Sequence, residues 1–488
     1  MDNITKIIKR GSNSSMSEKD FLLREILNWK KSIKRKNMIL GAQYYAGFHD
    51  ILNRQRTVIG KDGLLQVVDN LPNNRIIDNQ YAKMVDQKKN YLLSKRLTFN
   101  TENDDYADSL NEVFNNRFHR TLKNIGEDSL NGGISWLHPY YGEDGTLKFK
   151  KFESYEILPF WKDAEHTDLD FAVRLYEVES YNGIYEETIE KVEVYTTEGI
   201  KRYVLQNNSL IPDVENPSSS YMILENDEGV QEFNWDNKIP LIAFKCNAKE
   251  IPLIVRVKSL QDAINITISD FENNMQEDPR NTILVIENYD GTDLAEFRHN
   301  LATYGAVKVR SVDGAKGGVN TLTIEVNSEN YKVILELLKE ALIENARGYD
   351  AQDEKMSGSP NQMNIQSMYN DIDLDANDME TEFQASFEDL LWFVNIHLAN
   401  IGKGDFTKED LQIVFNRTMM MNESEIMSTL LSAGVTISNE TLLSQVPFIH
   451  DVEKEKERIK EEQEELVTNE YDNAFTVTPE VGDDDAEE

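Results

Sequence analysis

The sequence predicts an α+β protein, and two contrasting patterns carry that prediction. Between residues 132 and 244, short segments rich in Tyr, Val and Phe alternate apolar with polar residues, which is typical of antiparallel strands. On either side of this region, apolar residues recur three and four positions apart, the period of amphipathic helices. A chain of 488 residues is long enough for two or three domains.

The N-terminal part is predicted to be helical. Residues 17–58 read as helix and contain a basic cluster, which we interpret as a solvated helix face rather than a phosphate contact: Lys30, Lys31, Lys34, Arg35 and Lys36. Residues 73–99 carry apolar positions at helical spacing, and 104–126 suggest a further helix.

The strand-rich region follows. Its expected strands, separated by clusters of Gly, Asn and Asp, are 146–152, 171–178, 191–196, 201–205 and 241–244. Pro217 marks a loop before the last of them.

Two amphipathic helices are then expected to frame a small α/β insert. The first has its stripe at Val257, Leu260, Ile264, Ile268, Phe271 and Met275, and the second at Tyr331, Ile334, Leu338 and Leu342. Between them we expect strands 282–287, 306–310 and 321–326, a short helix 294–301 and a Gly-rich turn 314–318. Such an arrangement can project the insert on a two-helix stalk.

The C-terminal third is predicted to begin with a loop at 350–363, which lacks periodicity. A long helix follows, with Met379, Phe383, Phe387, Leu390 and Leu398 on one face. A strand at 411–415, helices at 422–465 and an acidic tail complete the chain.

Composition excludes several classes of protein. With 51 basic and 87 acidic residues, the net charge of −36 argues against a large basic surface that grips nucleic acid. The single cysteine, Cys246, excludes an intrachain disulfide framework and a cysteine-based zinc cluster. No signal-peptide pattern and no run of about 20 apolar residues appear, so we expect a soluble, non-exported protein with no membrane contact.

One acidic string has the spacing of a calcium loop, with oxygens at positions 1, 3, 5, 7 and 12: Asp371, Asp373, Asp375, Asn377 and Glu382. Two positions disagree, because Ala376 replaces the glycine of the sharp turn and Asp378 stands where an apolar residue packs. We therefore favour an acidic helix start, where carboxylates interact well with the helix dipole. No metal site is predicted.

No other motif supports catalysis. The turn Gly314 to Gly318 lacks phosphate-loop spacing and precedes a predicted strand rather than a helix. The seven histidines show no metal-ligand spacing, and Cys246 has no histidine partner in sequence. The sequence predicts no enzyme and no cofactor.

Three stretches, in order along the chain, resemble the portal proteins of long-tailed double-stranded DNA bacteriophages (siphovirus type). Residues 73–99 resemble the early helix signature, with counterparts at Val85, Asp86, Lys88, Tyr91 and Leu92. Residues 348–391 resemble the tunnel-loop and tunnel-helix region, and 413–459 resemble the C-terminal crown.

The resemblance implies a portal fold with a β-rich wing, a two-helix stem, a small α/β clip, a long tunnel helix and a helical crown. The implied divisions are N-terminal helices and wing 1–250, first stem helix 251–278, clip 279–327, second stem helix 328–348, tunnel loop 349–363, tunnel helix 364–402, crown 403–466, and a disordered acidic tail 467–488. The candidate channel residues are Gln352, Asp353, Lys355, Met356, Ser357, Ser359 and Asn361. Lys355 is either a transient DNA contact or a solvated loop lysine.

The resemblance also implies a ring, typically of twelve subunits, at one vertex of the virion capsid. The ring would be assembled in the host bacterial cytoplasm. The implied partners are the terminase large subunit, a head-completion adaptor, the major capsid and scaffolding proteins, and double-stranded DNA passing through the channel. At −36 per subunit, twelve copies would carry about −430 and repel phosphate, so DNA could slide without being held.

Two other functions remain open from the sequence. Another capsid-assembly protein, an adaptor or a scaffold-associated protein, would explain the acidity and the lack of catalytic motifs. A metal-dependent nuclease would use the acidic string between Asp371 and Glu382.

Overall fold

The structure, a computed structural model, describes residues 17–60, 62–69, 71–182, 185–226, 229–277, 283–287, 318–322, 328–350 and 362–417, with a few isolated residues beyond these ranges. The chain divides into two compact units, Met1–Tyr349 with Asp371–Thr418, and Asp350–Asn370 with Met419–Glu488. Every element below lies in the first unit, apart from the start of the long helix.

The predicted helical stretch 17–58 is two helices and a hairpin. Helix α2 (Glu18–Lys31) ends where Ser32 adopts an extended conformation, and the Ser32 hydroxyl then caps α3 (Ile33–Tyr45) by accepting the Arg35 N–H at 3.1 Å. A short 3-10 turn, η1 (Asp50–Asn53), leads to the antiparallel strands β1 (Thr57–Ile59) and β2 (Leu65–Val67). One serine side chain thus divides the helix by offering a new N-terminal cap.

The basic cluster is only partly the solvated face that we predicted. Lys30 pairs with Glu190, and Lys34 pairs with Glu250. Arg35 donates to the Tyr155 carbonyl at 3.0 Å. These cations therefore join the N-terminal helices to the strand-rich region.

The helix predicted at 73–99 is shorter than expected. Helix α4 spans Gln80–Leu93, with Asn79 as its N-cap, and residues 73–79 are extended. Two helices, α5 (Asp104–Val113) and α6 (Asn116–Gly132), replace the single one expected at 104–126. The extended segment makes its hydrogen bonds with another helix, as described below, so it has no need of helical ones.

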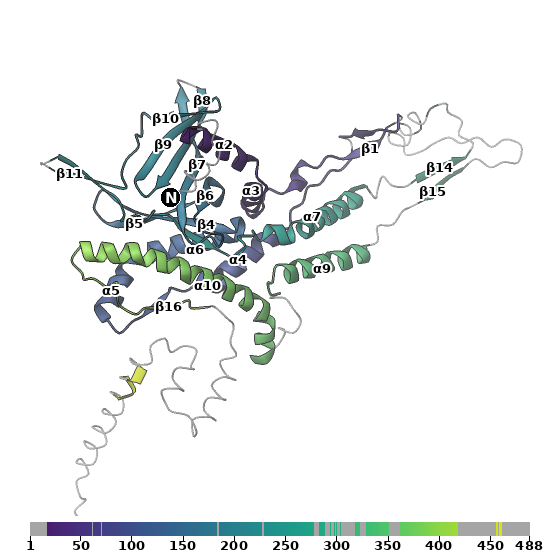
Figure 1. The fold of residues 1–488 in the computed structure, drawn as a ribbon. Coiled ribbons are helices and arrows are strands. Elements are labelled where there is room, and N and C mark those ends of the chain that lie inside the picture. Colours follow the sequence, from purple (N-terminus) through teal and green to yellow (C-terminus); the bar gives the residue numbers. More distant parts are fainter. Residues whose placement is uncertain are drawn as a thin grey trace, which may run out of the picture. The chain divides into compact units, whose positions relative to one another are not determined.

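The predicted antiparallel strands are confirmed, in two sheets (Figure 1). A five-stranded meander contains β6 (Ile157–Trp161), β7 (Leu169–Asn182), β8 (Tyr185–Thr196), β9 (Gly199–Gln206) and β10 (Ser209–Pro212). A three-stranded sheet orders β13 (Ile242–Lys245), β4 (Ile134–Tyr141) and β5 (Leu147–Phe152). A core cluster that includes Trp136, Phe152 and Ile157 joins the two sheets, and we call this region with α2–α6 the body.

The two predicted amphipathic helices lie side by side (Figure 1). They are α7 (Ile254–Glu277) and α9 (Ser328–Asn345), and we call this pair the stem. The Phe271 and Tyr331 rings lie 5.2 Å apart between them. The predicted stripe is only partly covered, since Val257 and Ile264 are buried whereas Met275 is 48% exposed.

The insert between the stem helices is described only in part. Strand β14 (Ile283–Glu287) pairs with β15 (Gly318–Leu322) in antiparallel fashion. Strand β15 begins three residues before the expected 321–326 and takes in the last glycine of the predicted turn. Predicted strand 306–310 lies outside the described residues, as does most of helix 294–301.

The long helix is α10 (Gln362–Asn400), and it packs against the body through aromatic rings. Phe383 and Phe387 meet Phe244 of β13 edge to face, at centroid distances of 5.1 and 5.8 Å. Strand β16 (Gln412–Val414) confirms the prediction at 411–415 and pairs with β3 (Thr98–Asn100). The predicted helices at 422–465 and the acidic tail lie almost wholly outside the described residues.

Helices α3 and α6 touch through a glycine. A Cβ atom on Gly41 would lie 2.1 Å from the Asn131 carbonyl oxygen, and backbone cannot move aside as a side chain can. We expect Gly41→Ala to lower the free energy of unfolding by about 2 kcal/mol through overpacking. Gln43→Ala, on the exposed side of the same helix, should change it by less than about 0.5 kcal/mol. Urea unfolding measures both, and equal effects would contradict this packing.

Candidate functional site: the joints between body, stem and long helix

The predicted channel loop cannot be compared with the structure. All seven candidate residues, from Gln352 to Asn361, lie outside the described residues, so Lys355 as a DNA contact stays a prediction. The structure does describe the chain on both sides of this loop, the end of α9 and the body of α10.

We predicted that the acidic string at 371–382 is the start of a helix, and this prediction is wrong. The string lies in the interior of α10, which begins at Gln362. Successive helical residues turn by about 100°, so side chains two positions apart point in opposing directions and cannot surround one ion. In the described part of the chain, no group of three or more His, Cys, Asp or Glu side chains could hold a metal ion.

The carboxylates of the string instead form ion pairs. Asp375 lies 2.7 Å from the Lys88 ammonium, and Arg256 and Arg347 approach the same carboxylate at 3.5 and 3.4 Å. Asp373 accepts a hydrogen bond from the Tyr91 hydroxyl at 3.0 Å. The hypothesis that these residues form the metal site of a nuclease therefore loses support, because cationic side chains already pair with the carboxylate that would bind the metal.

Lys88 is the centre of this joint. Its side chain is only 4% exposed, and it also donates to the Arg347 carbonyl at 3.1 Å. Burial lowers the pKa of Lys88, and the Asp375 carboxylate opposes that effect. The preceding residue, Gln87, accepts a hydrogen bond from the N–H of Tyr349 at 3.0 Å and donates one to the carbonyl of Tyr349 at 2.8 Å.

Helix α4 therefore holds both sides of the predicted channel loop. Gln87 and Lys88 bind the chain at Arg347–Tyr349, just after α9, and Lys88 with Tyr91 binds α10 at Asp373 and Asp375.

A second joint connects α7 with the extended segment before α4. Four polar side chains at intervals of four residues, Gln261, Asn265, Ser269 and Asn273, are fully buried. Three of them accept a hydrogen bond from a backbone N–H of that segment: Asn265 from Asp78 at 3.1 Å, Ser269 from Ile76 at 2.9 Å, and Asn273 from Asn74 at 2.7 Å. Gln261 accepts at 2.8 Å from the N–H of Tyr81, in the first turn of α4.

The spacing of these bonds has a simple geometric cause. Every second N–H of an extended chain points the same way, and two such residues advance about 6.6 Å. Four residues of helix advance about 6 Å and return to the same face. Residues 74–78 can therefore lie along α7 as a strap, with one hydrogen bond per helical turn.

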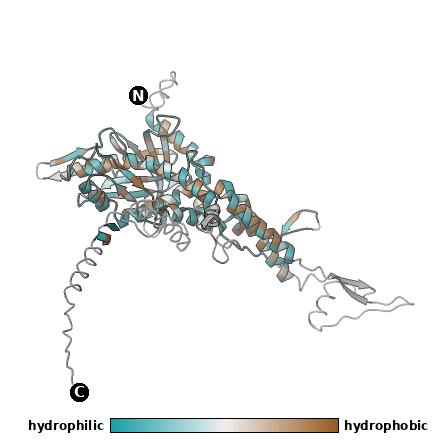
Figure 2. Cartoon of the chain, turned by 90° about the horizontal axis from the view of Figure 1, so that it is seen from below, coloured by the Kyte–Doolittle hydropathy of each residue, from teal (hydrophilic) through white to brown (hydrophobic). Residues whose placement is uncertain are grey.

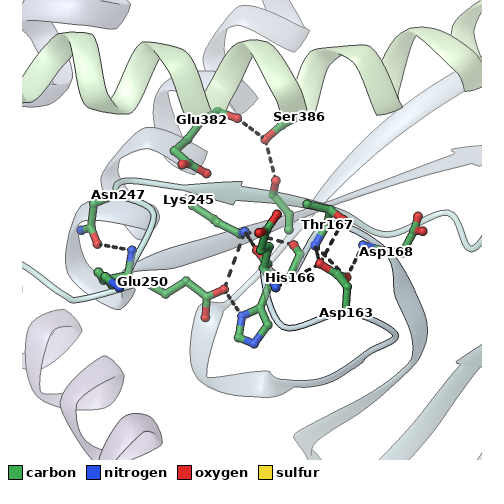
Figure 3. A network of polar contacts seen from close by, with 12 residues as sticks. Asp163, His166, Thr167, Asp168, Lys245, Asn247, Glu250, Glu382 and Ser386 are labelled. Atoms are coloured by element: carbon green, nitrogen blue, oxygen red, sulfur yellow. Dashed lines mark hydrogen bonds and ion pairs between the residues drawn. The ribbon is translucent and has the colours of Figure 1, made fainter. Parts of the chain in front are cut away.

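A third joint lies below α10, where β13 leads into α7 (Figure 3). Glu250 sits at a left-handed φ of 53°, with its side chain 3% exposed. Its carboxylate pairs with Lys34, accepts from His166 Nδ1 at 2.6 Å, and lies 3.9 Å from the Lys245 ammonium. Burial raises the pKa of Glu250, but Lys34 and His166 more than offset this, so the net pKa is lowered.

The same network reaches the long helix. The Ser386 hydroxyl donates to the Ala243 carbonyl of β13 at 2.6 Å, while Lys245 donates to the His166 carbonyl at 3.0 Å (Figure 3). A groove of about 1260 Å³ lies here, lined among others by Lys34, His166, Glu250 and Asp389. The groove carries both signs of charge, so it does not select for an anion or a cation.

Sequence reasoning found only the apolar side of α7. The polar row was visible as Gln, Asn, Ser and Asn at intervals of four residues, but its partners are backbone groups some 190 positions away. Only the fold places them together. Glu250 carried no signal in the sequence at all.

The described chain has a body, a two-helix stem that carries an insert, and a long helix packed on the body, which is the order of parts that the resemblance to phage portal proteins implies. It belongs to the phage portal protein family described as SPP1 Gp6-like, whose model matches residues 28–468. This confirms the resemblance seen in the sequence.

Two portal proteins are similar over nearly the whole chain. That of Bacillus phage SPP1 is 31% identical over 461 residues, covering 92% of this chain and 88% of the relative. That of Clostridium phage phiCD119 is 27% identical over 457 residues, covering 90% and 96%.

Among solved structures, a chain from the neck of an empty GTA particle aligns with a TM-score of 0.41 and 9% identity, covering 75% of this chain and 89% of that chain. No helix in the described part of the chain is both long and apolar enough to span a membrane.

Proposed function

We propose that twelve copies of this chain form a ring-shaped channel at one vertex of the phage capsid. DNA enters through it during packaging by the terminase large subunit and leaves through it at ejection, and a head-completion adaptor connects it to the tail. The major capsid protein and scaffolding proteins surround the ring during assembly in the host cytoplasm.

The single observation that carries this proposal is the family match over residues 28–468, with relatives named portal proteins that cover nine-tenths of the chain. Portal proteins are structural, ring-forming components of the virion that work with the capsid and terminase, so no catalytic site is proposed here.

In this proposal the parts of the structure take the roles that the resemblance implies. The body corresponds to the wing, α7 and α9 to the stem, β14 and β15 to the clip, and α10 to the tunnel helix. The loop 349–363 faces the channel, and helix α4 holds the chain at Arg347–Tyr349 and at Asp375, on its two sides. Residues 403–466 form the crown.

Negative-stain electron microscopy of the purified protein, with its mass from light scattering, tests the proposal. Rings with a central channel and a mass of about 670 kDa, twelve times 56.2 kDa, are the expected result. Ring closure can depend on other capsid proteins. If the purified protein is monomeric, the experiment is therefore repeated with scaffolding and capsid proteins present. Monomers under both conditions, or a compact dimer with catalytic activity, would overturn it.

A further inference from the structure

The β1–β2 hairpin has one apolar face that no described part of the chain covers. The register pairs Ile59 with Leu65 and Thr57 with Val67, and directly paired residues project on the same side. Ile59, Leu65 and Val67 are 77%, 73% and 55% exposed. We call these three residues and Thr57 the outer face.

The base of the hairpin is attached to the stem of the same copy. Arg54 and Arg56 precede β1 and contact Asp270 of α7 at 2.7 and 3.8 Å. Asn73, after β2, donates to the Arg54 carbonyl at 3.1 Å, and the strap then begins at Asn74. The base of the hairpin is therefore held on α7, and Figure 2 shows the hairpin standing out from the side of the stem.

An isolated two-stranded hairpin is marginally stable in water, and its free edges invite pairing with another chain. Three large apolar side chains in a row on such a hairpin are a cost in a monomer. This hairpin has the properties of a surface that is buried in an assembly.

A second uncovered apolar surface lies on α9. Val333 and Leu337 are 51% and 59% exposed, one helical turn apart, with Ile334 beside them at 49%. Val333 and Leu337 point away from the side on which Tyr331 and Leu342 meet the protein interior, and Ile334 lies at the border between the two sides. Figure 2 shows apolar residues on the stem helices. We call these three residues the α9 patch.

Charge decides which surfaces can meet. The exposed carboxylates Glu336 and Glu340 flank the α9 patch, and the exposed Lys332 lies 4.0 Å from Glu336, so the border of the patch carries a net negative charge. Two such patches facing each other would bring these net negative borders together. The outer face of the hairpin contains no carboxylate. The net negative charge beside the patch also repels a phosphate backbone, which argues against nucleic acid as the occupant.

We propose that the outer face of the hairpin in one copy packs on the α9 patch of the neighbouring copy in the ring. This rests on the proposed ring. The contact joins the hairpin of one copy to a different surface, the α9 patch, of the next copy. Such head-to-tail interfaces close into rings when the rotation between copies allows it. The hairpin then acts as a clasp between adjacent stems.

Disruption of the hairpin tests the consequence for assembly. Leu65→Asp places a charge at the centre of the outer face and is expected to raise the protein concentration needed for rings about tenfold or more. The matched control is Ile223→Asp, because Ile223 is 54% exposed on β11 (Met222–Asn226) of the two-stranded β11–β12 hairpin. Light scattering follows assembly, and circular dichroism confirms that both variants fold.

Cross-linking tests the contact itself. The native Cys246 is buried, and burial raises its pKa to about 12, so a bismaleimide reacts only with introduced cysteines. A Leu65→Cys protein is mixed with a Leu337→Cys protein, and a covalent dimer that needs both is expected.

Three outcomes would be decisive. A dimer formed by Leu65→Cys alone would show hairpins meeting each other and overturn the proposal. The proposed contact would also be overturned if rings formed without a cross-link between Leu65→Cys and Leu337→Cys, or if Leu65→Asp left assembly unchanged. Either result would leave the proposed function, a ring of subunits, unaffected. Failure of the unmodified protein to form rings with its capsid partners would instead contradict the proposed function.

Discussion

Replacing Asp375 by alanine is expected to lower the free energy of unfolding by about 3 kcal/mol, because it leaves the Lys88 ammonium buried without its carboxylate. The Arg347 carbonyl would still accept one hydrogen bond from Lys88, but it does not neutralise the charge. Asp378→Ala, which removes an exposed carboxylate from the same helix, should cost less than about 0.5 kcal/mol. Urea unfolding compares the two.

The pH dependence of this loss has a defined sign. Burial holds the pKa of Lys88 below its ordinary value of 10.5, and removal of Asp375 lowers it further. The unfolded chain then binds more protons than the folded one between the lowered pKa and 10.5, so the stability of the variant should rise with pH in that window.

A double variant separates loss of an ion pair from loss of packing. Lys88→Met with Asp375→Leu removes both charges and should recover most of the lost stability. If the double variant were as unstable as Asp375→Ala, shape rather than charge would account for the effect, and our account of this joint would be wrong.

Replacing Asn265 by leucine is expected to lower the free energy of unfolding by about 3 kcal/mol, because it removes the buried acceptor on α7 that binds an N–H of the strap. Asn265 accepts from the Asp78 N–H at 3.1 Å and from Gln261 Nε2 at 3.0 Å, and it donates to His49 Nδ1 at 2.8 Å. All three partners would be left without this bond in a place that water does not reach.

Amide hydrogen exchange tests where in the protein this loss of stability occurs. The amides of Ile76, Asp78 and Tyr81 should exchange faster in Asn265→Leu, because the strap would separate from α7 without unfolding of the whole body. Gln276→Leu is the control, since Gln276 is exposed on the same helix and its hydrogen bond to Glu272 lies on the surface. Unchanged exchange rates at these amides would contradict our claim that Asn265 holds the strap on α7.

Local patterns predicted much of the fold. The strands around β7–β9 and the helices α7, α9 and α10 were recognisable because each buries one face, and burial of one face forces a period of two or about 3.6 residues in the sequence. The errors lie where a single side chain changes local geometry. Ser32 divides a helix by capping the next one, and residues 73–79 stay extended although their apolar spacing is helical.

By itself, the sequence determined the α+β class, the order of body, stem, insert and long helix, and the portal family, because periodicity and family motifs are properties of neighbouring residues. Only the tertiary structure decided what the polar residues do. The string from Asp371 to Glu382 became an ion-paired helix face once Lys88, Tyr91 and Arg347 were brought to it, and Gln261 and Asn265 became the seat of a strap. A charge or an amide is defined by its partner, and here each partner lies far away along the chain.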